Sequence, residues 1–196
     1  MEQLPSLRAV PNLIMLRPSD ATETAEAWRV ALTHTAGPVG LVLTRQKLPV
    51  IDRTRFAPAG GLARGAYVLA DTVGSAPDVI LIATGSEVSL ALEAHERLAG
   101  EGIRCRVVSM PSWELFESQP CTYRDNVLPP TVRTRVSIEA ASPFGWERYV
   151  GPEGAIIGVT RFGASAPGPV VMREYGFTPE HVVDTVKAVL TRRAEP

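Results

Sequence analysis

Short apolar runs alternate with amphipathic segments along the chain, and the first such group lies between residues 12 and 46. Apolar runs at 13–16 and 39–43 flank a segment whose small and apolar residues recur at helical spacing. These residues are Ala21, Thr24, Ala25, Trp28, Ala31 and Leu32. The pattern predicts a strand, a helix and a second strand, and because a helix connects the two strands, we expect them to be parallel.

Both ends of this predicted helix carry sequence signals. Asp20, followed three residues later by Glu23, resembles a capping box, and Gly37-Pro38 ends the helical pattern. Two strands and one helix leave both edges and one face of the sheet uncovered. We therefore expect this unit to dock on the rest of the chain or on something outside this sequence.

A second pattern of strands and helices follows residues 49–65, where Pro, Gly, Arg and Ala appear without clear periodicity, as in a linker between domains. This predicts a boundary near residue 60. Beyond it, helices are expected at 86–99, ended by Gly102, and at 179–190, capped by Thr178-Pro179. Strands are expected at 79–83, 104–108, 135–138 and 155–159, with 67–69 as an additional edge strand. The alternation is typical of an α/β fold.

Composition and charge narrow the function classes. The 196 residues are enough for one domain or for one domain plus a piece of another. Because 20 basic and 21 acidic side chains leave a net charge of −1, binding to nucleic acid or to an anionic membrane is disfavoured. The apolar run Leu13 to Leu16 is too short to span a bilayer, and no signal peptide precedes it. With only Cys105 and Cys121 as thiols, a reduced, cytoplasmic location is expected.

The turn Thr84-Gly85-Ser86-Glu87 joins a predicted strand to a predicted helix. Free backbone amides at such a turn can hold an anion. The turn lacks the glycine spacing of a dinucleotide fingerprint and the lysine of a phosphate-binding loop, so simple helix capping is favoured. Thr84 and Glu87 also fit a capping box.

Other candidates for chemistry are weaker. The segment around Ser165 resembles a nucleophile elbow but ends in Pro167, which disfavours a catalytic serine. The three histidines, His34, His95 and His181, are too far apart for metal-ligand spacing. Glu139 ends an apolar strand, where its carboxylate can be functional or can bond loop amides, and the structural role is favoured.

Arg45 is the most informative charged residue. It follows the predicted strand at 39–43 and would stand at the carboxyl edge of a parallel sheet, where ligands of open α/β folds collect. A guanidinium there can bind a phosphate through two parallel hydrogen bonds. From the residues alone, however, an ordinary surface role is the stronger interpretation.

Taken together, these segments resemble the transketolase family along almost the whole chain. The stretches that carry the resemblance are Leu7-Arg8, Pro11-Asn12, Arg17-Pro18-Ser19-Asp20, Ala27-Trp28, Leu43-Thr44-Arg45-Gln46, Arg64 to Leu69, Ile82 to Val88, Val107 to Pro111, Tyr149-Val150-Gly151, Phe162 to Pro167 and Tyr175 to Thr178. The segment Ala140 to Gly145 departs from the family pattern, which more often continues Glu-Ala-Gly.

The resemblance implies a domain organisation. Residues 1–55 would be the end of the pyrimidine-binding domain, 56–66 a linker and 67–196 the family's C-terminal domain, a mainly parallel five-stranded sheet with helices on both faces. In the family, the segment like Glu2-Gln3-Leu4 follows soon after a Thr-His-Gln-Pro loop, so the chain is expected to begin inside a domain. The remaining domains and a homodimer partner would then complete the enzyme.

The resemblance also implies an activity. Such enzymes transfer a two-carbon ketol unit between sugar phosphates, using thiamine diphosphate and a divalent metal, Mg or Ca. Arg45 matches the arginine that binds the sugar phosphate, which reverses the interpretation from the residues alone. No other catalytic, cofactor or metal residue of the family maps onto this chain, so we expect it to be inactive alone and to bind none of these groups. A non-catalytic module that binds a small anion or a partner near Gly85-Ser86 is the alternative.

Overall fold

A mainly parallel sheet forms the centre of the molecule in the computed structural model, which describes residues 1–72, 74 and 76–194. Its strand order is β3 (Tyr67–Ala70), β5 (Cys105–Ser109), β4 (Val79–Ala83), β6 (Arg135–Ile138) and β7 (Ala155–Ile157). Only the edge strand β3 is antiparallel to its neighbour. The predicted strands, including the one at the edge, are confirmed.

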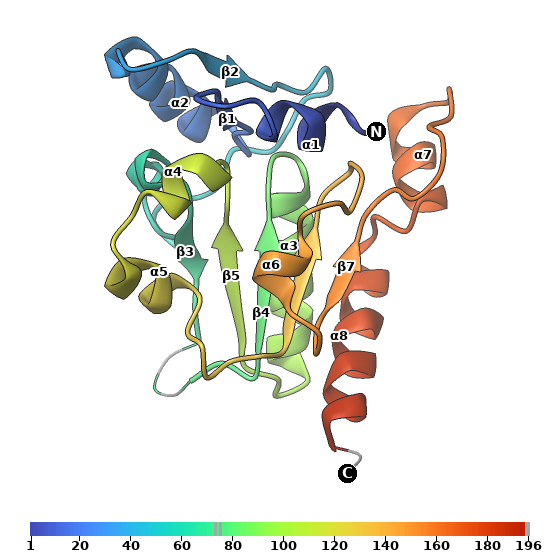
Figure 1. The fold of residues 1–196 in the computed structure, drawn as a ribbon. Coiled ribbons are helices and arrows are strands. Elements are labelled where there is room, and N and C mark those ends of the chain that lie inside the picture. Colours follow the sequence, from blue (N-terminus) through green and yellow to red (C-terminus); the bar gives the residue numbers. More distant parts are fainter. Residues whose placement is uncertain (73, 75, 195–196) are drawn as a thin grey trace.

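Helices cover both faces of this sheet because its central strands are apolar on both sides (Figure 1). In β4, Val79, Leu81 and Ala83 pack on one side, while Ile80 and Ile82 pack on the other. The first side contacts α3 (Glu87–Gly100) and α8 (Pro179–Ala194). The second contacts α4 (Trp113–Glu117), α5 (Cys121–Val127) and α6 (Glu147–Val150). This is the three-layer α/β arrangement that was expected.

Residues 1–41 form a separate group, called here the N-terminal unit. It contains α1 (Gln3–Arg8), β1 (Ile14–Leu16), α2 (Ala21–Thr33) and β2 (Val39–Leu41). Strands β1 and β2 are parallel, as predicted, and pair only with each other among the described residues. In Figure 1 the unit lies across the end of the large sheet toward which β4 and β5 point. It therefore docks on the rest of the chain.

Helix α2 begins with the predicted cap but packs through an unexpected side. Asp20 accepts a hydrogen bond from the Glu23 amide at 2.8 Å, and Glu23 in turn accepts one from the Ser19 amide at 2.8 Å. Trp28, part of the repeating pattern that predicted the helix, is 52% exposed. The fully buried positions are Glu23 and Ala27. The pattern thus predicted the helix correctly, while the docked face is defined by other residues.

The segment between the two parts of the fold is well packed. It contains the short helix η1 (Ala59–Arg64), in which Leu62 is fully buried beside β1 and α2. Ile51 packs into the core of the large sheet. Gly65 ends the segment at φ 82°, and a Cβ there would lie 2.1 Å from the Phe116 amide nitrogen. Only glycine fits that turn.

The C-terminal region contains one helix that lies on the surface. In α7 (Gly168–Glu174) no residue is buried, whereas α8 contributes several valines to the core. The predicted cap of α8 is confirmed, because the Thr178 hydroxyl accepts a hydrogen bond from the His181 amide at 3.2 Å. Within the described ranges, none of the helices is both long enough and apolar enough to cross a membrane.

Candidate functional site

The carboxyl end of β1 is joined to the large sheet through the backbone of Arg17. The Arg17 amide donates to the carbonyl of Pro111 at 2.9 Å, and its carbonyl accepts from the Gly85 amide at 3.1 Å. Arg17 follows β1 directly, while Gly85 follows β4. The carboxyl ends of strands from both parts of the fold therefore meet at this residue.

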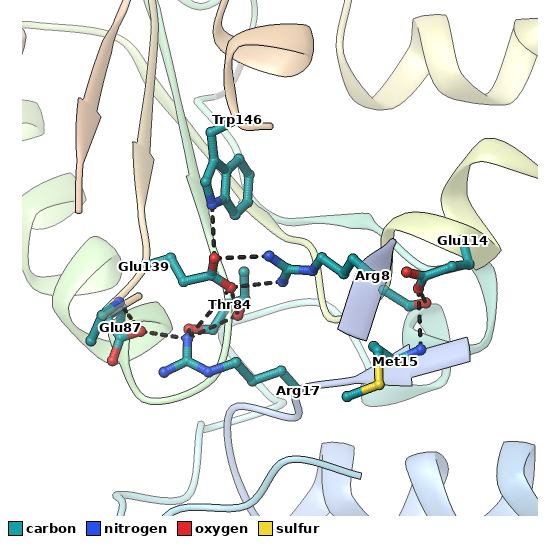
Figure 2. Close-up of polar contacts among 10 residues, drawn as sticks. Arg8, Met15, Arg17, Thr84, Glu87, Glu114, Glu139 and Trp146 are labelled. Atoms are coloured by element: carbon teal, nitrogen blue, oxygen red, sulfur yellow. Dashed lines mark hydrogen bonds and ion pairs between the residues drawn. The ribbon is translucent and has the colours of Figure 1, made fainter. Parts of the chain in front are cut away.

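The Arg17 side chain extends into the turn between β4 and α3 (Figure 2). Its Nη1 lies 2.8 Å from the Thr84 carbonyl, 2.9 Å from Thr84 Oγ1 and 2.5 Å from Glu87 Oε2. Burial lowers the pKa of the Arg17 guanidinium, but the charge and hydrogen bond of Glu87 and the charge of Glu139 raise it more, so the guanidinium stays protonated. A Cβ at Gly85 would lie 2.7 Å from Arg17 Cζ, which explains the glycine.

Arg8 approaches the same edge of the sheet from α1. It forms two hydrogen bonds with Glu139, of 2.9 Å and 2.7 Å, while the Trp146 indole donates to Glu139 at 2.8 Å (Figure 2). Burial alone would raise the pKa of Glu139, but hydrogen bonds and charge from Arg8, with Arg17 and Trp146, hold it below its ordinary range. Glu139 is thus an ionised acceptor for Arg8 and holds α1 in place.

A second buried network joins α2 to the large sheet. Glu23 Oε1 accepts hydrogen bonds from the Tyr67 hydroxyl at 2.6 Å and from the Ser109 hydroxyl at 2.7 Å. Arg53 donates to the Tyr67 oxygen at 3.0 Å and pairs with Asp20 at 3.2 Å. Burial raises the pKa of Tyr67, as does the nearby Glu23, so its hydroxyl remains a donor.

The residues Arg8, Arg17, Thr84, Glu87 and Glu139 are called the arginine interface below. They occupy the carboxyl edge of the large sheet, the place where open α/β folds usually bind ligands. The turn at residues 84–87 therefore contacts the Arg17 guanidinium, which is paired with the Glu87 carboxylate. This guanidinium lies where a bound anion had been considered. The predicted capping role is also wrong, because no side chain caps α3 and the Glu87 carboxylate binds Arg17 instead.

Arg45 lies four residues beyond the end of β2, and among the described residues its side chain has no hydrogen-bond or ion-pair partner. It is exposed. The backbone before it is fixed, because the Val42 amide donates to the Leu16 carbonyl at 2.8 Å. Beyond Val42, the Thr44 hydroxyl donates to the Gln46 carbonyl at 2.9 Å. The guanidinium is thus available on an anchored backbone.

Comparison with known proteins identifies the family. The model of the transketolase-like C-terminal domain matches residues 65–178, and the model of the transketolase pyrimidine-binding domain matches residues 1–50. The chain belongs to the transketolase family. The transketolase of Geobacillus stearothermophilus is 55% identical to it over 190 residues. That match covers 97% of this chain but 28% of the relative, so the chain spans little more than a quarter of its length.

Solved transketolase structures show the same fold. A Pichia stipitis transketolase in complex with sedoheptulose 7-phosphate has a TM-score of 0.89 and 36% identity, covering 99% of this chain and 27% of that chain. A split-gene transketolase described as an inactive β4 tetramer has a TM-score of 0.77 and 26% identity, covering 97% of this chain and 62% of that chain. Both structural matches cover the N-terminal unit as well as the large sheet.

The transketolase chain offers no metal-ligand set in its described part, where no three His, Cys, Asp or Glu side chains are grouped to hold an ion. His34, His95 and His181 are not brought together, and burial lowers the pKa of the His95 imidazole. Ser165 lies in an exposed loop. The described residues do not fit a metal-bound diphosphate.

Sequence reasoning missed the two arginines of the interface. Arg17 directly follows the apolar strand β1, and Arg45 lies a few residues beyond β2, so the expectation that ligands collect at the carboxyl ends of parallel strands applied to Arg17 as well. Arg8 gave no such signal, because α1 was not predicted. Their carboxylate partners lie far along the chain, and only the fold brings these groups together.

Proposed function

We propose that this chain is the C-terminal part of a transketolase that transfers a two-carbon ketol unit between sugar phosphates. In this proposal residues 1–55 complete the pyrimidine-binding domain, 56–66 connect it, and 67–196 form the C-terminal domain. The matches to both transketolase domain models support the assignment. Thiamine diphosphate and a divalent metal would be held by parts of the enzyme outside this chain and would supply the carbanion chemistry.

Arg45 is proposed to bind the phosphate of the sugar. The observation that carries this role is its exposed guanidinium, unpaired among the described residues, at the carboxyl end of β2. A planar guanidinium binds two phosphate oxygens at once, which a lysine cannot do. The sugar phosphate in the complex of the Pichia stipitis relative supports this class of substrate.

By itself the chain is proposed to be inactive. The split-gene relative, described as an inactive β4 tetramer, supports this. The exposed Trp28 and Leu32 of α2, which are 52% and 78% accessible, are proposed to be covered by the remaining transketolase domains. The complete enzyme would be a cytoplasmic homodimer.

A chimera tests the proposal. The matching region of the Geobacillus stearothermophilus transketolase is replaced by this chain, and ketol transfer is measured with ribose 5-phosphate and with ribose as acceptors. The chimera should be active and the chain alone should not. Arg45→Ala should raise KM for ribose 5-phosphate by about 30-fold or more, since a charged hydrogen-bonding partner contributes about 2 to 3 kcal/mol.

The controls separate a phosphate contact from a general effect. Arg45→Ala should change kcat/KM for ribose by less than about twofold. Lys47→Ala, two residues away, should change kcat/KM little for either acceptor. Turnover by the isolated chain would contradict its proposed inactivity. Equal losses with both acceptors would remove the phosphate role from Arg45.

A further inference from the structure

The segment that carries Arg45 depends on β1 for its position. In the described part of the fold, β2 has no partner strand other than β1, and their register ends at Leu16 opposite Leu41. The next ladder contact is the Val42 amide on the Leu16 carbonyl at 2.8 Å. Arg45 follows three residues later, and among the residues that the structure describes its own side chain has no hydrogen-bond or ion-pair partner to hold it.

The carboxyl end of β1 is in turn fixed by Arg17, the residue after Leu16. Its backbone bonds to Pro111 and to Gly85, and its guanidinium bonds to Thr84 and Glu87. The Arg17 side chain is 10% exposed, and that of Glu87 is fully buried. Glu87 itself is held, because its Oε2 also accepts a hydrogen bond from the Ala140 amide at 2.9 Å.

We infer that Arg17 is a positioning residue for sugar-phosphate binding, acting through the Leu16–Val42 contact on Arg45. This inference rests on the proposed role of Arg45. A continuous series of bonds leads from α3 through Arg17 and β1 to the segment after β2. Bidentate binding of a phosphate requires a guanidinium placed within about 0.5 Å of its productive position. Loosening Arg17 should therefore weaken binding of phosphorylated acceptors.

The Arg8–Glu139 pair distinguishes positioning from simple docking. It belongs to the same interface and is equally buried, with 5% and 1% of the two side chains exposed. Arg8 lies in α1, before β1, and has no bond to the carboxyl end of β1 or to β2. Its loss should loosen the N-terminal unit as a whole, whereas loss of Arg17 should release the end that carries Arg45.

The experiment compares four variants of the chimera described above: Arg17→Gln, Arg17→Lys, Arg8→Gln and Arg45→Ala. For each, kcat and KM are measured with ribose 5-phosphate and with ribose, together with the thermal midpoint. Arg17→Gln should raise KM for ribose 5-phosphate by about tenfold while changing kcat/KM for ribose by less than about threefold. Arg17→Lys should recover part of the loss, because an ammonium can still pair with Glu87.

Arg8→Gln should lower the thermal midpoint by about as much as Arg17→Gln does. It should change kcat/KM for ribose 5-phosphate and for ribose by the same factor. If Arg17→Gln also changes kcat/KM for both acceptors by the same factor, Arg17 has only a docking role and the inference is overturned. If Arg45→Ala fails to discriminate between the acceptors, the proposed function fails first. Should Arg17→Gln not fold, Glu87→Gln replaces it, since the amide oxygen can still accept from Ala140, and the same ratio of effects decides the outcome.

Discussion

The guanidinium of Arg8 and the carboxylate of Glu139 form two parallel hydrogen bonds of 2.9 Å and 2.7 Å, although 131 residues separate them in the chain. Both side chains are almost completely buried. A pair of this kind joins the first helix to the end of β6, and through it the N-terminal unit to the large sheet. Its removal has consequences that can be measured.

Replacing one member of this pair should be strongly destabilising. Glu139→Gln leaves the Arg8 guanidinium buried without its countercharge, and we expect a loss of about 3 kcal/mol in the free energy of unfolding. The exposed pair Arg55–Glu96 supplies the control, since its side chains are 62% and 54% accessible. Arg55→Gln should cost less than about 1 kcal/mol. Urea unfolding followed by tryptophan fluorescence measures both, and equal losses would contradict the account.

The pH dependence of stability should follow the same carboxylate. The pKa of Glu139 in the folded protein lies below its ordinary value of 4.5: burial raises it, but Arg8, Arg17 and Trp146 lower it more. Below pH 4.5 the unfolded chain therefore binds more protons than the folded one. This contribution to stability is complete above that pH and is lost as the pH falls through the folded pKa.

Unfolding measured between about pH 7 and pH 3 tests this expectation. The stability difference between the unaltered chain and Glu139→Gln should shrink as the pH falls, at up to about 1.4 kcal/mol per pH unit. Glu153→Gln, which removes the exposed partner of Arg133, should show a small difference at every pH. A difference for Glu139→Gln that stays constant with pH would show that the pKa of Glu139 is the same in the folded and the unfolded protein, which would contradict the lowered pKa.

Gly65 offers a test of the turn between η1 and β3. Its φ is 82°, and an added Cβ would lie 2.1 Å from the Phe116 amide nitrogen and 2.5 Å from the Ser112 carbonyl oxygen. We expect Gly65→Ala to cost about 3 kcal/mol or more, from backbone strain and steric overlap together. Gly102 has a similar φ of 79° with nothing within 4 Å of its Cβ position.

Gly102→Ala therefore isolates the backbone term, and it should cost only about 1 kcal/mol. The two variants are compared by thermal or urea unfolding under identical conditions. If both substitutions cost the same, close packing of η1 against α4 is not what requires glycine at position 65.

Much of the fold was predictable because strands and helix ends depend on residues close together in the chain. The run at 79–83 coincides with β4, and Asp20 caps α2 as predicted. Arg45 could be singled out because it lies a few residues beyond the carboxyl end of β2, although its role in binding phosphate remains a proposal. These features follow from local periodicity, capping and strand order.

The docked faces and the arginine interface were decided only by tertiary structure. Glu23 is buried because Tyr67 and Ser109, 44 and 86 residues away, supply its hydrogen bonds, so α2 packs through a charged position while Trp28 stays exposed. Arg17 is held by Glu87 for the same reason. Burying a charge is favourable only when its partner is already in place, and no local pattern in a sequence records which distant residue will be there.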